Sequence, residues 1–217
     1  KTKQQHDIYY DTKNCTLTRN NVWLRTRNGK WQLKYPPNAD EYNDIQSLPS
    51  QTSLTAIYRE TDNLPQIASY VSNILFREDR SMDKHSTDEL DDWMRKECKL
   101  ECLCEFTTTR QSYRMCYKQR EYAIDLDGTD FGCHMMEIEL LLPSECSQHQ
   151  IKQANQDLDT FCEYLLSPVM NVAASSTIHT KIQIYLYEHR REAHDIIVEA
   201  GFFPAFDRKQ CYNKSCL

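Results

Sequence analysis

Glycine is scarce in this 217-residue sequence, and its scarcity argues against one class of phosphate site. Only four glycines are present, and none forms the Gly-rich loop that cradles phosphate with backbone N–H groups. Any phosphate site must therefore be built from side chains.

Long apolar runs and a surplus of positive charge are also missing. No stretch approaches the roughly 20 consecutive apolar residues that a membrane-spanning helix needs. The formal net charge of −6 is opposite to the charge of a general nucleic-acid binder. We therefore expect no membrane or nucleic-acid partner. We also expect a monomeric, cytoplasmic protein.

The cysteines lack the spacing of a disulfide framework. Ten are scattered along the chain from Cys15 to Cys216, and we interpret most of them as reduced thiols. The densest group, Cys98, Cys102 and Cys104, has no CxxC pair and no matching second half. It is more typical of small apolar residues on a strand than of a zinc site.

Short alternating segments separated by turn residues are abundant, and they predict antiparallel strands. The predicted strands are Ile8–Tyr10, Val22–Arg27, Trp31–Tyr35, Leu54–Tyr58, Leu100–Thr109, Tyr113–Tyr117, Tyr122–Leu126, Met135–Leu142 and Ile178–Leu186. The pair Asn28-Gly29 predicts a type I′ hairpin. Apolar residues at helical spacing predict four helices, around Ile67–Leu75, Leu90–Met94, Ile151–Leu165 and Ala193–Ala200.

Charged side chains on the predicted strands are sorted by sign. Residues two apart on a strand face the same way, so Arg25 and Arg27 share a face, and Lys34 lies on the same face of the next strand as Lys30 and Gln32. The acidic pairs lie on two other strands, Asp125 with Asp127 and Glu137 with Glu139.

Two interpretations of this pattern are open. The charges can be the solvated face of an antiparallel sheet whose other face packs on helices. A solvated face explains charge but not its sorting by strand. The sorting favours a curled sheet that holds a metal on one wall and polyphosphate on the opposite wall, and a closed sheet also removes exposed edges.

A series of short motifs occurs along the chain. Tyr9-Tyr10-Asp11-Thr12 precedes Trp23-Leu24-Arg25-Thr26-Arg27 and Trp31-Gln32-Leu33-Lys34, and these are followed by Thr108-Thr109-Arg110, Ile124-Asp125-Leu126-Asp127, Asp130-Phe131-Gly132, Glu137-x-Glu139 and Lys181-x-x-x-Tyr185-Leu186. In order and spacing they resemble the CYTH, or triphosphate tunnel metalloenzyme, family, and within it the thiamine triphosphatases.

The resemblance implies an α+β fold, a closed or nearly closed tunnel of eight antiparallel strands with accessory helices. It implies that Arg25, Arg27, Lys34, Arg110 and Lys181 grip phosphate oxygens, that Asp125, Glu137 and Glu139 bind Mg²⁺ or Mn²⁺, and that Trp23 stacks on the organic end of the substrate. Trp23 can instead plug the tunnel structurally. Arg114 and Asp127 are second-rank candidates, and Glu60 is left unassigned.

The resemblance spans about residues 9–186 of a single expected domain, 1–217, with a C-terminal helix and tail at 187–217. The family's first strand carries Glu-x-Glu-x-Lys, and nothing like it precedes Tyr9. We expect that strand to be missing from this chain, through truncation rather than genuine loss.

The implied activity is a Mg²⁺-dependent removal of the terminal phosphate from thiamine triphosphate or from inorganic tri- or polyphosphate. Two alternatives are a module that binds polyphosphate without hydrolysis and an adenylyl-cyclase-like member of the same family. The sequence does not choose the substrate.

Overall fold

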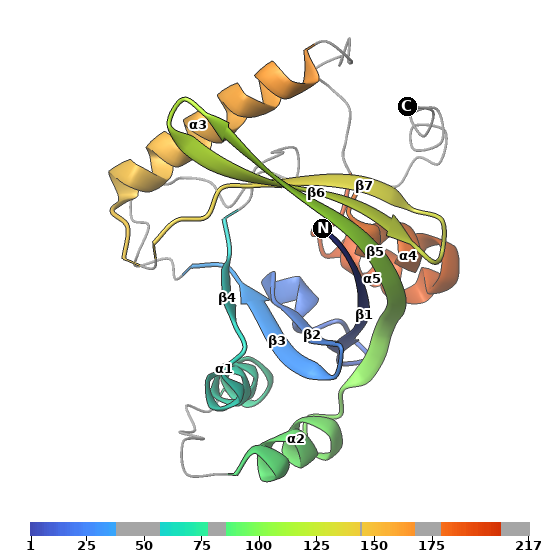
Figure 1. The fold of residues 1–217 in the computed structure, drawn as a ribbon. Helices are drawn as coiled ribbons and strands as arrows, with labels where there is room; N and C mark the ends of the chain where they lie inside the picture. Colours follow the sequence, from blue (N-terminus) through green and yellow to red (C-terminus); the bar gives the residue numbers. More distant parts are fainter. Residues whose placement is uncertain (38–56, 78–85, 144, 168–178, 205–217) are drawn as a thin grey trace.

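The computed structural model describes residues 1–37, 57–77, 86–143, 145–167 and 179–204. In this part of the chain, seven antiparallel strands form one sheet that curls into half of a barrel (Figure 1). Their spatial order is β4-β3-β2-β1-β5-β6-β7. The strands are β1 Thr2–Asp11, β2 Trp23–Arg27, β3 Lys30–Tyr35, β4 Arg59–Thr61, β5 Glu101–Tyr117, β6 Arg120–Thr129 and β7 His134–Glu139.

Helices surround this sheet. They are α1 Leu64–Phe76, α2 Thr87–Lys96, α3 Gln148–Leu166, α4 Lys181–His189 and α5 Arg191–Glu199, with a short 3-10 turn at Thr18–Asn20. Within the described ranges, no helix combines the length and the apolar character needed to cross a membrane. The predicted α+β fold, a curled antiparallel sheet with accessory helices, is confirmed.

Two tight hairpins have the left-handed backbone of a type I′ turn. Asn28 and Gly29 have φ values of 50° and 81°, as predicted for the β2–β3 connection. Lys118 and Gln119, between β5 and β6, have φ values of 45° and 66°, although neither residue is a strong turn former. No pair of typical turn-forming residues marks this second turn.

The convex face of the sheet is apolar and covered by helices (Figure 1). Leu24 of β2 and Leu33 of β3 are buried in one cluster with residues of α1 and α2. Tyr122 of β6 packs on Phe161 of α3, with ring centroids 4.0 Å apart. The alternation predicted for these strands is confirmed, because the apolar residues face outward to the helices and the charged residues face the concave side.

Helices α4 and α5 form a third apolar cluster with residues of the central strands. Leu186 of α4 and Ile197 of α5 are buried together with Tyr9 of β1 and Phe106 of β5. Tyr9 and Phe106 lie on the same face of the sheet as Asp7, so α4 and α5 pack on the concave side. This packing brings the N-terminus of α4 close to the charged residues of the sheet.

The predicted strand Ile178–Leu186 is wrong, because residues 181–189 form helix α4. The alternation of Ile182, Ile184 and Leu186 imitates the period of a strand. Thr180 caps the helix by accepting a hydrogen bond from the backbone N–H of Gln183. Burial of Leu186 against the sheet then favours the helical period over the strand period.

Two further strand predictions need correction. The segments Leu100–Thr109 and Tyr113–Tyr117 are one continuous strand, β5, paired with β6 from Thr108 to Tyr117. Most of the predicted strand Leu54–Tyr58 lies outside the described residues, and the described strand there is β4, which begins at Arg59.

Candidate functional site

The acidic side chains Asp125 and Asp127 on β6 and Glu137 and Glu139 on β7 form what we call the acidic wall of the concave face. Arg110 of β5 lies at its centre. Its Nη1 donates to Asp125 Oδ2 at 2.6 Å, and its Nη2 donates to Asp127 Oδ2 and Glu137 Oε2, each at 2.6 Å. Its Nε donates to Asp127 Oδ1 at 2.7 Å. The pairing of β5, β6 and β7 produces this convergence, because Arg110 lies opposite Asp127, and Asp125 lies opposite Glu137.

Lys181 reaches the same carboxylates from helix α4. Its Nζ lies 2.8 Å from Glu137 Oε1 and also contacts Asp127 Oδ2. The Asp127 side chain has no exposed area and is held by both cations. Asp127, a second-rank candidate from the sequence, therefore lies at the centre of the cluster.

Mutual pairing keeps these groups charged despite their burial. Burial opposes ionisation of Asp127 and Glu137, but Arg110 and Lys181 outweigh it, so the pKa of each carboxyl lies below its ordinary value. Burial likewise opposes the charge of the two cations, but the carboxylates outweigh it and raise the pKa of both Arg110 and Lys181. The cluster is an electrically compensated network in which each charge depends on its partners.

Glu139 differs from the other acidic residues. Burial raises its pKa above the ordinary value, and the charges of Glu137 and Glu60 act in the same direction, while Lys34 opposes them. Lys34 lies on β3 and Glu60 on β4, whereas Glu139 lies on β7 at the other edge of the sheet. The curl thus brings the two ends of the sheet within electrostatic reach of each other.

The basic wall consists of Arg25 and Arg27 on β2 and Lys34 on β3, and β1 supplies partners for the two arginines. Arg27 donates two hydrogen bonds to Asp7, from Nε to Oδ1 and from Nη2 to Oδ2, both 2.7 Å long. Arg25 donates from Nη1 to the hydroxyl oxygen of Tyr9 at 3.0 Å and from Nε to Gln32 Oε1 at 3.0 Å. Both guanidinium groups are fixed on the concave face.

Lys34 and Trp23 lie beside these arginines. Lys34 Nζ is 3.3 Å from Glu60 Oε1. The Lys34 side chain is 39% exposed and is therefore more accessible than the side chains of Arg25 and Arg27. Trp23 packs against Phe203, with ring centroids 6.1 Å apart, and belongs to the apolar cluster of α4 and α5. Trp23 thus packs on the α4–α5 cluster and lies on the same face of β2 as Arg25 and Arg27.

Sequence reasoning missed Asp7 and Tyr9 as partners of the arginines, and it left Glu60 unassigned. The strand predicted from the sequence begins only at Ile8, whereas β1 begins at Thr2, so the prediction does not include the inward-facing residues 5 and 7. Arg114, the other second-rank candidate, is 57% exposed and lies 3.8 Å from Glu121, further along the β5–β6 hairpin.

The donor chemistry of the acidic wall fits a divalent cation. Carboxylate oxygens are the ligands that Mg²⁺ prefers, and here three carboxylates converge on a single cationic group, the Arg110 guanidinium. In the described part of the chain, no three or more His, Cys, Asp or Glu side chains are placed so that they could hold a metal ion together. A metal ion would therefore take the position of a side-chain cation on these carboxylates.

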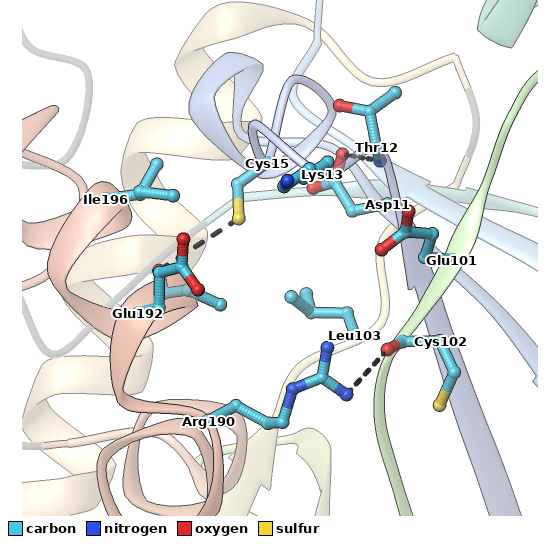
Figure 2. A pocket seen from close by; sticks show the side chains of 11 residues that line it. Asp11, Thr12, Lys13, Cys15, Glu101, Cys102, Leu103, Arg190, Glu192 and Ile196 are labelled. Atoms are coloured by element: carbon cyan, nitrogen blue, oxygen red, sulfur yellow. Dashed lines mark hydrogen bonds between the residues drawn. The ribbon is translucent and has the colours of Figure 1, made fainter.

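A separate hollow of about 120 Å³ lies at the end of β1, where that strand meets the start of β5 and helix α5. Figure 2 shows Arg190 donating to the backbone carbonyl of Cys102 beside the hollow. Asp11, which also lines it, accepts hydrogen bonds from the backbone N–H groups of Thr12, Leu17 and Thr18. Asp11 therefore holds the loop after β1 and is not part of the charged cluster.

Comparison with known proteins identifies similar sequences and folds. The CYTH domain family profile matches residues 1–161, which include all seven strands and most of helix α3 but neither α4 nor α5. Human thiamine-triphosphatase is 23% identical over 209 residues, which is 90% of this chain and 77% of the human protein.

Two solved structures also match. A Bacillus halodurans protein proposed to be an adenylate cyclase matches 85% of this chain and 82% of its own, at 18% identity and a TM-score of 0.42. A Hippeastrum protein proposed to be an adenylyl cyclase, with a dominant triphosphatase activity, matches 76% of this chain and 74% of its own, at 19% identity and a TM-score of 0.38.

Proposed function

The chain belongs to the CYTH family, and from this starting point we propose that it is a Mg²⁺-dependent hydrolase that removes the terminal phosphate of a linear triphosphate. The substrate is thiamine triphosphate or inorganic tri- or polyphosphate. The observation that carries the proposal is the pairing of Arg110 and Lys181 with three carboxylates on the concave face, opposite a second group of cations on β2 and β3.

This network favours joint binding of an anion and a metal. A triphosphate alone would take Arg110 and Lys181 from their carboxylates and leave buried acids without counter-charge, which is costly. A metal alone would displace the two cations and leave them unpaired. When both bind, the triphosphate pairs with the cations and the metal pairs with the carboxylates, so every charge keeps a partner.

The residues of the chain can then act by placement and charge compensation, which is most of what phosphoryl transfer requires. Arg25, Arg27 and Lys34 would hold the phosphates against one wall, while Arg110 and Lys181 spread the charge that develops on the transferred group. A Mg²⁺ ion bound by Asp125, Glu137 and Glu139 would polarise phosphate oxygens.

Trp23 is the residue that would favour an organic head group. An indole on the concave face attracts a thiazolium ring by cation–π interaction, worth about 1–2 kcal/mol when desolvated. Human thiamine-triphosphatase, at 23% identity, is consistent with this preference. Inorganic polyphosphate uses the cations alone and needs no such contact.

The test is phosphate release from thiamine triphosphate, tripolyphosphate and ATP, with and without Mg²⁺, by the wild-type protein and by Glu137→Ala and Glu139→Ala variants. We expect metal-dependent release from at least one of the first two substrates and a loss of about 100-fold or more in the variants. A rate of phosphate release that changes neither with Mg²⁺ nor with these two substitutions would exclude the proposal.

Two other outcomes identify the alternative functions. Tight tripolyphosphate binding without phosphate release would indicate a polyphosphate-binding module. Formation of a cyclic nucleotide and diphosphate from ATP would indicate the adenylyl-cyclase-like branch of the family.

A further inference from the structure

Two oxygen atoms on the concave face are buried without a hydrogen-bond partner in the described part of the chain. They are Oε1 of Gln5 on β1 and Oγ1 of Thr108 on β5. The two residues lie directly opposite each other in the antiparallel pairing of β1 and β5. Thr108 is 1% exposed, so its hydroxyl group is closed off from bulk solvent.

Such a pair is unusual, because a buried polar atom without a partner costs about 1–3 kcal/mol. Nearby polar groups on the same face do have partners: Asp7 pairs with Arg27, and Asp127 pairs with Arg110 and Lys181. The fold thus pairs these charged groups and leaves an amide oxygen and a hydroxyl group without partners at opposite positions of β1 and β5. Unsatisfied buried groups of this kind are typical of sites that hold a water molecule or a ligand.

The position of the pair relates it to both walls. Along β1 and β5, the inward-facing pairs are Lys3 with Arg110, Gln5 with Thr108, and Asp7 with Phe106. Thr108 therefore lies two residues from Arg110 on the same face, about 7 Å away along the strand. Gln5 lies two residues from Asp7, which anchors Arg27. The pair occupies the floor between the two groups of cations.

We propose that Gln5 and Thr108 hold the water molecule that attacks the terminal phosphate, an inference that rests on the proposed hydrolase function. The amide oxygen of Gln5 accepts one hydrogen bond from this water, and the Thr108 hydroxyl group forms a second. A lone pair of the water is thereby directed toward a phosphate held by Arg110.

The reaction step balances without a further reactant. The water oxygen forms a bond to the terminal phosphorus, and the bridging P–O bond breaks, with its electron pair leaving on the diphosphate oxygen. The water proton passes to an oxygen of the departing inorganic phosphate. In a loose transition state this transfer comes late, so a neutral amide and hydroxyl suffice to orient the water.

Thr108→Val tests the proposal, because valine keeps the shape of threonine and removes the hydroxyl group. Gln5→Met removes the amide at the partly exposed partner position and serves as the second variant. Thr109→Val is the matched control, since Thr109 is the exposed neighbour on the opposite face of the same strand. Thr108→Ser retains the hydroxyl group. Circular dichroism and the thermal unfolding midpoint confirm that each variant is folded.

With tripolyphosphate and Mg²⁺, we expect kcat to fall by about 100-fold in Thr108→Val and Gln5→Met. We expect KM, and the tripolyphosphate Kd measured by calorimetry, to stay within about two-fold of wild type, because the phosphate contacts are unchanged. Thr108→Ser should retain most of the activity, and Thr109→Val all of it.

Wild-type kcat in folded Thr108→Val and Gln5→Met variants would overturn this assignment while the hydrolase function stands. A weaker tripolyphosphate Kd with unchanged kcat would also overturn it, since the pair would then bind phosphate rather than water. A wild-type protein that releases no phosphate from any substrate would instead overturn the proposed function, and this assignment with it.

Discussion

Asp7 accepts both hydrogen bonds of the Arg27 guanidinium group, each 2.7 Å long, through a carboxylate that is 2% exposed. This bidentate geometry fixes the direction of Arg27 on the concave face before any anion arrives. It also makes Asp7 a residue whose loss affects both folding and binding.

Asp7→Asn should lower the free energy of unfolding by about 3 kcal/mol, because it removes the counter-charge of a largely buried guanidinium. Urea unfolding measures the change. The control is Asp92→Asn, which removes an exposed i,i+4 pair with Lys96 and should cost no more than about 0.5 kcal/mol. Tripolyphosphate should restore part of the stability of Asp7→Asn, since phosphate supplies the missing negative charge. Equal losses in the two variants would contradict this account.

Trp23→Leu should change substrate preference. If the indole stacks on an organic head group, kcat/KM for thiamine triphosphate should fall about 10-fold, while that for tripolyphosphate stays near wild type. Parallel steady-state measurements on the two substrates give the ratio. An equal decline for both substrates would assign Trp23 to packing against Phe203 alone.

Removal of divalent metal with EDTA should abolish phosphate release, and added Mg²⁺ should restore it. Because Asp125, Asp127 and Glu137 are engaged by side-chain cations, Mn²⁺ should bind weakly by itself and more tightly with a non-hydrolysable triphosphate analogue. Electron paramagnetic resonance of Mn²⁺ measures both affinities. Equal affinity with and without the analogue would show that the two ligands bind independently.

Alkaline pH should destabilise the protein through Cys15. Burial, reinforced by Asp11, raises the pKa of this thiol from 9.0 to about 11. The unfolded thiol ionises first as the pH rises above 9, so the contribution to stability is complete below pH 9 and declines toward pH 11. Urea midpoints across this range should decline less steeply for Cys15→Ala than for the exposed control Cys116→Ala. If the urea midpoints of the two variants declined equally with pH, the raised pKa of the Cys15 thiol would be refuted.

Alternation of side chains along strands was enough to predict which of these charged residues share the concave face. The inward positions of Arg25, Arg27 and Lys34, and of Asp125 and Glu137, follow from a period of two and from the need to bury the apolar residues between them. The Asn28-Gly29 turn fixed the register of β2 and β3 in the same local way.

Contacts between distant segments were not predictable in this way. The pairing of Arg27 with Asp7 depends on β1 lying beside β2, and no local pattern marks Asp7, which stands between His6 and Ile8. The helical state of α4 depends on the Thr180 cap and on packing against β5, which outweigh an alternation typical of a strand. Tertiary contacts decided these cases.

Helix α4 carries Lys181, although most of the charged cluster lies on strands that precede it in the chain. Since the ribosome releases a protein from its N-terminus onward, the sheet can form before Lys181 has left the exit tunnel. Until α4 docks, Asp127 and Glu137 share only Arg110 as a close cationic partner among the described residues. A nascent chain would therefore gain its full complement of compensated charge only after Lys181 has emerged and α4 has docked.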